Sequence, residues 1–197
     1  MTSLPHPGDI VNDYKIVKIL DTTANSTVYE ALSIHSAERV AIKMILVDES
    51  NRERVDNEIS LMKEIKSQHV LGLRDVFDFG NYKCVSMPLA TADLNLISKK
   101  KSSHKFCEHA VKEIIKSALE ALRDLHSQGI SHRDIKPDNF LLLEDGPSFL
   151  LADLGFAKKF NENELSTEYI GTLAYAAPEI INGTPCMFSS THNCVWY

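Results

Sequence analysis

The sequence lacks the long apolar runs and the basic excess that would mark a membrane protein or a nucleic-acid-binding module. No stretch of its 197 residues approaches the roughly 18 consecutive apolar residues that a membrane-spanning helix needs. Acidic residues outnumber basic ones by 27 to 21, and the formal net charge of −6 argues against a nucleic-acid partner. The first residues show no basic segment before an apolar one, so we expect no signal peptide and, by default, a cytoplasmic protein.

Cysteine is scarce, and the few cysteines follow neither a metal-binding nor a disulfide pattern. The four are Cys84, Cys107, Cys186 and Cys194, and no CxxC pair occurs among them. We therefore expect reduced thiols, without a disulfide framework or a zinc site shared with histidines. The chain also contains no internal repeat, no low-complexity segment and no nucleophile elbow, so a histidine-based nucleophilic triad has no support.

Hydrophobic residues make up 44% of the chain and charged residues 24%, as in an ordinary globular protein. The first half is rich in β-branched and aromatic runs, which predict strands, and residues 51–66 carry apolar side chains at helical spacing. The predicted strands cover residues 15–20, 27–31, 39–47, 76–79 and 83–87. In the second half, apolar residues at steps of three and four predict a long helix over 109–128, and two short apolar runs follow at 140–143 and 148–152.

These elements predict an α+β chain with a strand-rich small lobe and a mainly helical second lobe. The expected organisation is a tail over residues 1–13, the first lobe over 14–90, the second over 91–185 and a divergent end over 186–197. A link near residues 89–93 would join the lobes, and a cleft between lobes is the natural place for a ligand.

The two short apolar runs predict a hairpin that brings two oxygen-bearing side chains together. If the runs pair about Gly146, Phe140 faces Ala152, and one step outward Asn139 faces Asp153. Carboxamide and carboxylate oxygens suit Mg²⁺, which takes few protein ligands and completes its shell with water and phosphate.

The loop before this hairpin concentrates ionisable residues. It reads HRDIKPDN over residues 132–139, so a carboxylate, Asp134, and an amine, Lys136, lie within five residues of Asn139. That set can supply a base, a positive charge and a metal ligand.

Four motifs, in this order and at these intervals, resemble those of eukaryotic protein kinases. VAIK (40–43) is similar to the ATP-lysine strand, HRDIKPDN to the catalytic loop, DLG (153–155) to the metal-binding DFG motif, and GTLAYAAPE (171–179) to the end of the activation segment. The residues at two of these motif positions, Lys136 and Thr172, are similar to those of the serine/threonine branch of the family. The resemblance implies the two-lobed kinase fold, and because the pattern ends near Pro185 we expect an incomplete second lobe.

The resemblance implies transfer of the γ-phosphate of ATP, with Mg²⁺, to a serine or threonine hydroxyl of a protein substrate. Asp134 would take the hydroxyl proton, while Lys136 and Lys43 would stabilise charge on the phosphates. Asn139 would act with Asp153 to hold Mg²⁺.

The resemblance also implies a nucleotide site in which Glu58, on the inward stripe of its helix, pairs with Lys43. The alternatives are a surface helix glutamate and a solvated strand lysine. The other side chains implied to surround the adenine and ribose are Leu20, Val28, Ala41, Met87, Leu89, Asp93 and Leu141.

The activation segment carries Glu168 at the position, three before Gly171, where many relatives have a phosphothreonine. A carboxylate there would partly mimic phosphate by pairing with Arg133, although a solvated acidic loop is the alternative. Ser166 and Thr167 are candidate phosphorylation sites.

Two departures from the family pattern favour a second hypothesis. Residues 21–28 contain no glycine where the family has its phosphate-binding loop, which predicts weak nucleotide binding. The missing end of the second lobe is expected to leave the apolar stripe of residues 111–125 uncovered, which predicts either a protein partner that covers it or a tendency to aggregate. The alternative function is therefore a catalytically weak or inactive kinase-like module that binds a nucleotide or a partner.

Overall fold

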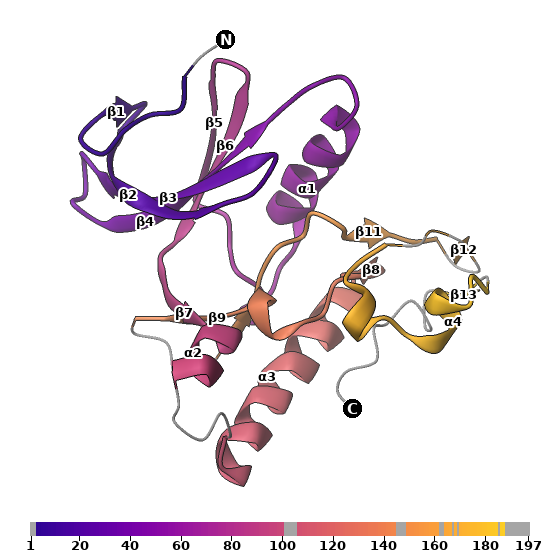
Figure 1. The fold of residues 1–197 in the computed structure, drawn as a ribbon. Helices are drawn as coiled ribbons and strands as arrows, with labels where there is room; N and C mark the ends of the chain where they lie inside the picture. Colours follow the sequence, from indigo (N-terminus) through magenta and orange to yellow (C-terminus); the bar gives the residue numbers. More distant parts are fainter. Residues whose placement is uncertain are drawn as a thin grey trace. The chain divides into compact units, whose positions relative to one another are not determined.

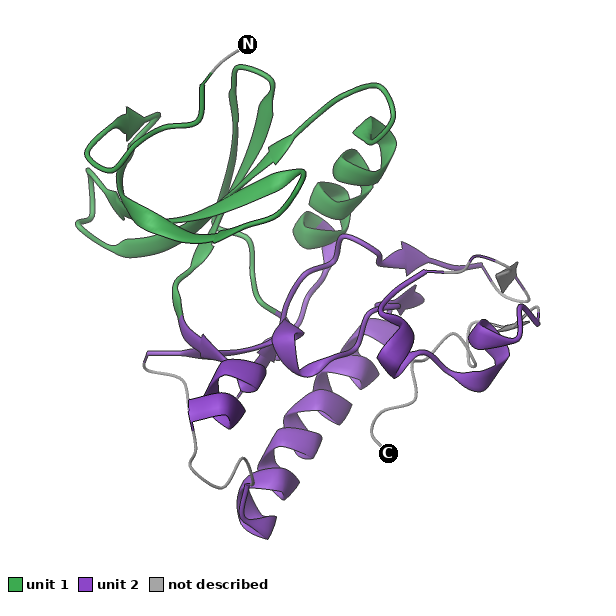
Figure 2. Cartoon of the chain, viewed as in Figure 1, with its two compact units in different colours: residues 1–63, 71–90 green, residues 64–70, 91–197 purple. Residues whose placement is uncertain are grey.

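The computed structural model of the chain describes residues 3–100, 106–144, 149–161, 164–166, 168, 170–184 and 186–187. Gly146 of the predicted hairpin turn, the candidate phosphorylation site Thr167 and residues 188–197 lie outside the described residues. The chain divides into unit 1, Met1–Lys63 with Leu71–Ala90, and unit 2, Glu64–Val70 with Thr91–Tyr197 (Figure 2).

Unit 1 is built on a six-stranded antiparallel sheet in the order β1-β2-β3-β4-β6-β5 (Figure 1). The strands are β1 (Ile10–Val11), β2 (Tyr14–Thr22), β3 (Ser26–Ser33), β4 (Arg39–Leu46), β5 (Asp75–Phe79) and β6 (Tyr82–Pro88). Helix α1 (Arg52–Glu64) follows β4. The five strands and the helix predicted from the sequence are all present with small shifts of their ends, whereas β1 is not among the predictions.

Each face of this sheet has its own apolar cluster, because side chains alternate between the faces of a strand. On one face, Ile45 and Val85 pack with Val55 and Ile59 of α1. On the other face, the cluster around Ile42 includes Val11, which is 2% exposed. The segment predicted as a tail, residues 1–13, therefore contributes a strand and a core residue to unit 1.

The turn before α1 is fixed by its own polar side chains. The Asp48 carboxylate accepts hydrogen bonds from the Ser50 N–H (2.8 Å) and the Asn51 N–H (3.1 Å). The Ser50 hydroxyl donates to the same oxygen, and this contact leads the hydrogen bonds that hold the pKa of Asp48 below its usual value. The Asn51 amide donates to the Leu46 carbonyl at 2.8 Å, so the end of β4 and the start of α1 are held together.

Unit 2 contains one long helix and several short elements. Its helices are α2 (Leu94–Lys100), α3 (Glu108–His126), α4 (Pro178–Ile181) and the 3₁₀ turns η1 (Pro137–Asn139) and η2 (Leu173–Tyr175). Its strands are β7 (Ala90–Asp93), β8 (Ile130–Ser131), β9 (Phe140–Leu143), β10 (Phe149–Leu151), β11 (Lys158–Lys159), β12 (Leu165–Ser166) and β13 (Cys186–Met187). They form a sheet β10-β9-β7 and the pairs β11-β8 and β12-β13.

Helix α3 agrees with the predicted helix to within two residues at each end, and it packs against β10 and β8. Most of its apolar stripe is buried there, including Ala118, Leu122 and Leu125. The expectation of an uncovered stripe is thus wrong for most of its length, because these short strands cover it. Val111 and Leu119 remain 39% and 56% exposed. Among the described residues, no helix is both long enough and apolar enough to cross a membrane.

The hairpin of β9 and β10 forms, but its register differs from the prediction by one residue. Phe140 pairs with Leu151 instead of Ala152. The Asn139 carbonyl accepts the Ala152 N–H at 2.8 Å, so Asn139 lies opposite Ala152 and Asp153 follows one residue later. Hairpin register depends on turn geometry as well as on the apolar pattern, and two apolar runs do not determine it.

Candidate active site

The predicted site residues lie in both units. In unit 1, the Lys43 ammonium on β4 lies 2.7 Å from the Glu58 carboxylate on α1. Their side chains are 19% and 7% exposed. Glu58 shares the buried stripe of α1 with Val55 and Ile59, so the inward placement predicted from helical spacing is what the structure has.

Three of the predicted nucleotide contacts share one face of the sheet with Lys43. Val28 lies opposite Lys43 across β3 and β4, and Met87 lies opposite Ala41 across β4 and β6. Directly opposite residues of antiparallel strands project to the same side, and Ala41 and Lys43 are two residues apart on one strand. An apolar surface therefore adjoins a charged pair. Leu20 on β2 is 42% exposed.

The β2–β3 turn, where the family has its glycine loop, is closed on itself by hydroxyl groups. The Thr23 N–H donates to the Ser26 carbonyl at 2.8 Å, and the Ser26 N–H donates to the Thr23 hydroxyl at 3.1 Å. The two hydroxyl oxygens lie 2.9 Å apart. No residue between 21 and 28 adopts a positive φ. The Ser26 amide, which a glycine loop would offer to a phosphate, already has a partner.

In unit 2, the buried carboxylate of Asp134 is the centre of the polar network. One oxygen accepts from the Lys136 ammonium at 2.7 Å. The other accepts from the Thr172 N–H at 2.9 Å and its hydroxyl at 2.7 Å. Lys136 also contacts that hydroxyl at 3.1 Å. A carboxylate and an ammonium thus meet at one hydroxyl, which is the arrangement that a proton acceptor and a phosphate-binding cation require.

His132 supports this loop through both of its ring nitrogens. Its Nδ1 accepts the Asp134 N–H at 3.3 Å, and its Nε2 donates to the Ala152 carbonyl at 3.0 Å. Burial lowers the pKa of His132, so the ring is neutral and can accept at one nitrogen while it donates at the other. The ring therefore links the catalytic loop to the backbone just before Asp153.

Asn139 and Asp153 both carry side-chain oxygens, and their binding of Mg²⁺ stays a prediction. The Asn139 amide nitrogen donates to the Asp134 carbonyl at 2.8 Å, which leaves its side-chain oxygen as the atom suited to a cation. Within the described residues, no group of three histidine, cysteine or acidic side chains is placed so that it could hold a metal ion. One carboxamide and one carboxylate fit Mg²⁺, because that ion keeps several waters and binds substrate phosphate.

Two residues of this region hold left-handed backbone conformations that side chains disfavour. Arg133 has a φ of 66° and Asp153 a φ of 63°. Such a conformation costs roughly 1–2 kcal/mol for a residue with a Cβ, so it persists only where neighbours enforce it. Strained backbone of this kind clusters at functional sites, which supports the assignment of both segments to the site.

Arg133 joins the catalytic loop to the activation segment. Its guanidinium donates to the Phe156 carbonyl at 2.7 Å, lies 5.9 Å from the centre of the Phe160 ring and forms an ion pair with Glu168. The pairing of Arg133 with Glu168 is the one expected from the sequence, whereas the two phenylalanines carry no signal that sequence analysis could have used.

The remaining predicted nucleotide contacts are Leu141 and Asp93 in unit 2 and Leu89 in unit 1. Leu141 on β9 pairs with Leu150 of β10. The Asp93 carboxylate accepts the Leu96 N–H at 2.7 Å and so caps the start of α2. Leu89 is half-buried between β6 and β7. Contact of these three with a nucleotide stays a prediction.

Comparison with known proteins identifies the family. The model of the protein kinase domain matches residues 14–196. A probable myosin light chain kinase of Dictyostelium discoideum is 32% identical over 181 residues, which cover 89% of this chain and 52% of that protein. The probable serine/threonine-protein kinase fhkD of the same organism is 32% identical over 186 residues, covering 90% and 25%. The calcium/calmodulin-dependent protein kinase type II of Schizosaccharomyces pombe is 32% identical over 212 residues, covering 90% and 41%.

The chain thus spans about half, or less, of the length of these relatives. The family model matches nearly all of the chain, and it includes all four motifs that resemble kinase motifs in the sequence. The lysine–glutamate pair, the catalytic-loop network and the family match agree, and the chain belongs to the protein kinase family.

Proposed function

We propose that this chain is a serine/threonine protein kinase domain that transfers the γ-phosphate of ATP to a hydroxyl group of a protein substrate. The observation that supports this best is the network in which Asp134 and Lys136 both contact the Thr172 hydroxyl. The relatives that are named as serine/threonine kinases support the acceptor class.

Asp134 acts as the proton acceptor of the reaction. As the substrate oxygen bonds to the γ-phosphorus and the bond between that phosphorus and the β–γ bridging oxygen breaks, the hydroxyl proton passes to Asp134, and ADP leaves. Lys136 lies 2.7 Å from this carboxylate, so its ammonium is positioned to stabilise negative charge on the transferred group.

Lys43 binds the α- and β-phosphates of ATP, and Glu58 holds its ammonium in place through the 2.7 Å contact. The face shared by Val28, Ala41 and Met87 contacts the adenine. Asn139 and Asp153 hold Mg²⁺, which neutralises phosphate charge when it is bound.

A phosphate-transfer assay tests this proposal. The purified chain is incubated with γ-labelled ATP, Mg²⁺ and a mixture of basic and acidic protein substrates, beside the Asp153→Ala variant. We expect labelled phosphoserine or phosphothreonine that the variant fails to produce. Equal labelling by both proteins would contradict the proposal. Nucleotide binding by the chain without any phosphate transfer would favour the alternative function. That alternative is a kinase-like module that binds ATP without efficient catalysis. The specific observation in its favour is the glycine-free turn of residues 21–28.

The closed β2–β3 turn makes a separate prediction about affinity. Changing Thr23 and Ser26 together to glycine removes the hydroxyl contacts and frees one amide for phosphate. A hydrogen bond to a charged group contributes about 1.5–3 kcal/mol, so we expect ATP to bind about tenfold more tightly or better. Titration with adenosine is the control, because adenosine has no phosphate and its affinity should not change. An equal gain in affinity for ATP and for adenosine would contradict the explanation that the freed amide binds a phosphate.

A further inference from the structure

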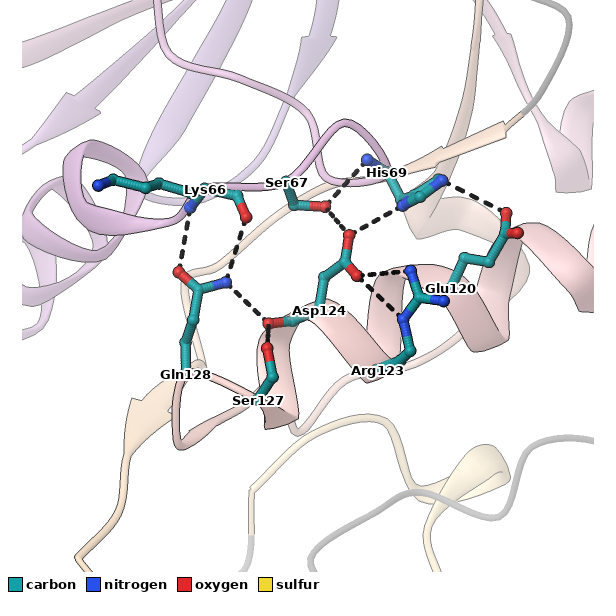
Figure 3. Close-up of polar contacts among 8 residues, drawn as sticks. All are labelled: Lys66, Ser67, His69, Glu120, Arg123, Asp124, Ser127 and Gln128. Carbon is teal, nitrogen blue, oxygen red and sulfur yellow. Dashed lines mark hydrogen bonds and ion pairs between the residues drawn. The ribbon is translucent and has the colours of Figure 1, made fainter.

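A second polar cluster lies away from the catalytic loop, where residues 64–70 meet the last turns of α3 (Figure 3). We call the contact of Ser67 and His69 with Glu120 and Asp124 the histidine clasp. His69 Nδ1 lies 2.8 Å from an Asp124 oxygen, and His69 Nε2 lies 3.3 Å from a Glu120 oxygen. The Ser67 hydroxyl donates to the same Asp124 oxygen at 2.7 Å and accepts the His69 N–H at 2.9 Å.

The histidine clasp is mostly enclosed and well satisfied. The side chains of His69 and Asp124 are 13% and 18% exposed. Hydrogen bonds, first from His69 and then from Ser67, lower the pKa of Asp124 to about 2, so this carboxylate is ionised over the physiological range. Beside it, the Gln128 carboxamide accepts the Lys66 N–H at 3.1 Å and donates to the Lys66 carbonyl at 3.3 Å (Figure 3). Side chains of α3 and of the turn after it therefore fix several successive residues of this segment.

The backbone of the same segment continues into the strand that precedes Asp153. The His69 carbonyl accepts the Leu151 N–H at 2.9 Å, and Val70 forms a parallel bridge with Leu151. On the other side, the Ala152 N–H donates to the Asn139 carbonyl at 2.8 Å. Leu151 and Ala152 are thus held from both sides immediately before Asp153, whose φ of 63° needs such support.

We infer that His69 is a positioning residue for Asp153. The histidine clasp fixes the His69 backbone on α3, this backbone fixes Leu151, and Leu151 fixes the start of the strained turn at Asp153. The inference rests on the proposed function, because it concerns the carboxylate proposed to hold Mg²⁺. Residues that orient a metal ligand change metal affinity by roughly 10–100-fold when they are mutated, without touching the metal.

Three variants separate this role from a general effect on stability. His69→Leu removes both side-chain contacts at similar volume. His69→Asn keeps a nitrogen on Cγ, where Nδ1 was, and so retains a donor to Asp124. Arg123→Gln is the control, because Arg123 is 68% exposed and also pairs with Asp124 but has no contact in the path from His69 to Leu151.

The first measurement is hydrogen exchange of residues 149–154, which needs no activity. In His69→Leu we expect exchange of the Leu151 amide to rise about tenfold or more relative to the rest of unit 2, because its acceptor is no longer fixed. We expect wild-type protection in Arg123→Gln and near wild-type protection in His69→Asn. Unchanged exchange in His69→Leu would overturn the inference, as would an equal rise throughout unit 2, which would indicate a merely structural role.

The second measurement is the Mg²⁺ concentration that half-saturates ATP binding. In His69→Leu we expect it to rise about tenfold, with the affinity for adenosine unchanged. If the wild-type chain responds to Mg²⁺ and His69→Leu needs the same Mg²⁺ concentration for half-saturation, the inference is overturned. If the wild-type chain shows no response to Mg²⁺ and ATP at all, the proposed function fails, and the exchange measurement still decides whether His69 holds the strand.

Discussion

Asp134→Asn is expected to lower the rate of phosphate transfer by about 10²–10⁴-fold, the range that a general base contributes. The carboxylate uses both oxygens, one toward Lys136 and the other toward Thr172. An amide of the same shape has a single acceptor oxygen, so its NH₂ group must meet one of these donors. The variant therefore loses the base and also part of the hydrogen bonding that orders the loop.

Single-turnover transfer from labelled ATP is the measurement for this variant. Affinity for ATP with Mg²⁺ should change little, because Asp134 is proposed to contact the acceptor hydroxyl and not the nucleotide. Asp138→Asn is the matched control, since it makes the same chemical change in the same loop, at an exposed carboxylate whose contact is the Asn95 amide at 2.7 Å. Transfer by Asp134→Asn at the rate of this control would show that Asp134 is not the base.

Gly171→Ala is expected to disrupt the site through the backbone alone. Gly171 has a φ of 102°, and a Cβ there would lie 2.3 Å from the Arg133 carbonyl oxygen. That separation is far inside van der Waals contact, so either the catalytic loop or the activation segment must move. Because the next residue, Thr172, donates two hydrogen bonds to Asp134, the displacement acts directly on the proposed base.

We expect Gly171→Ala to lose about 1–3 kcal/mol of unfolding free energy from backbone strain, and more from the overlap. We expect phosphate transfer to fall well beyond what this loss of stability explains. The control is Gly8→Ala, because Gly8 has a φ of 100° and a Cβ there meets no atom within 4 Å. The Gly8→Ala variant therefore has the same kind of backbone strain but no steric overlap of its Cβ. Equal effects of the two substitutions on transfer would mean that the close approach to Arg133 has no role in the site.

Much of the site can be predicted from the sequence, because it depends on local patterns. Helical spacing places Glu58 on the inward face of α1, and strand alternation places Ala41 on the same face as Lys43. The pairing of Arg133 with Glu168 follows from the resemblance to kinases, many of which have a phosphothreonine three residues before the position of Gly171. Each of these placements follows from the periodicity of a helix or strand or from a sequence motif.

The remainder depends on contacts between residues far apart in the chain. The β9–β10 register differs by one residue from the expectation, since two apolar runs fit either pairing. The histidine clasp joins residues separated by more than fifty positions, and neither His69 nor Asp124 belongs to a motif. The apolar stripe of α3 is covered by β8 and β10, which are two and three residues long and too short to predict as a cover.

The most direct test is the unfolding temperature of the purified chain, measured with and without ATP and Mg²⁺. It tests whether this chain folds into a domain with a working nucleotide site. A ligand at 100 times its dissociation constant should add about 2.7 kcal/mol to the unfolding free energy. We expect a cooperative transition that ATP raises only when Mg²⁺ is present, and that Asp153→Ala makes insensitive to Mg²⁺. A cooperative transition at the same temperature with and without ATP and Mg²⁺ would contradict the account.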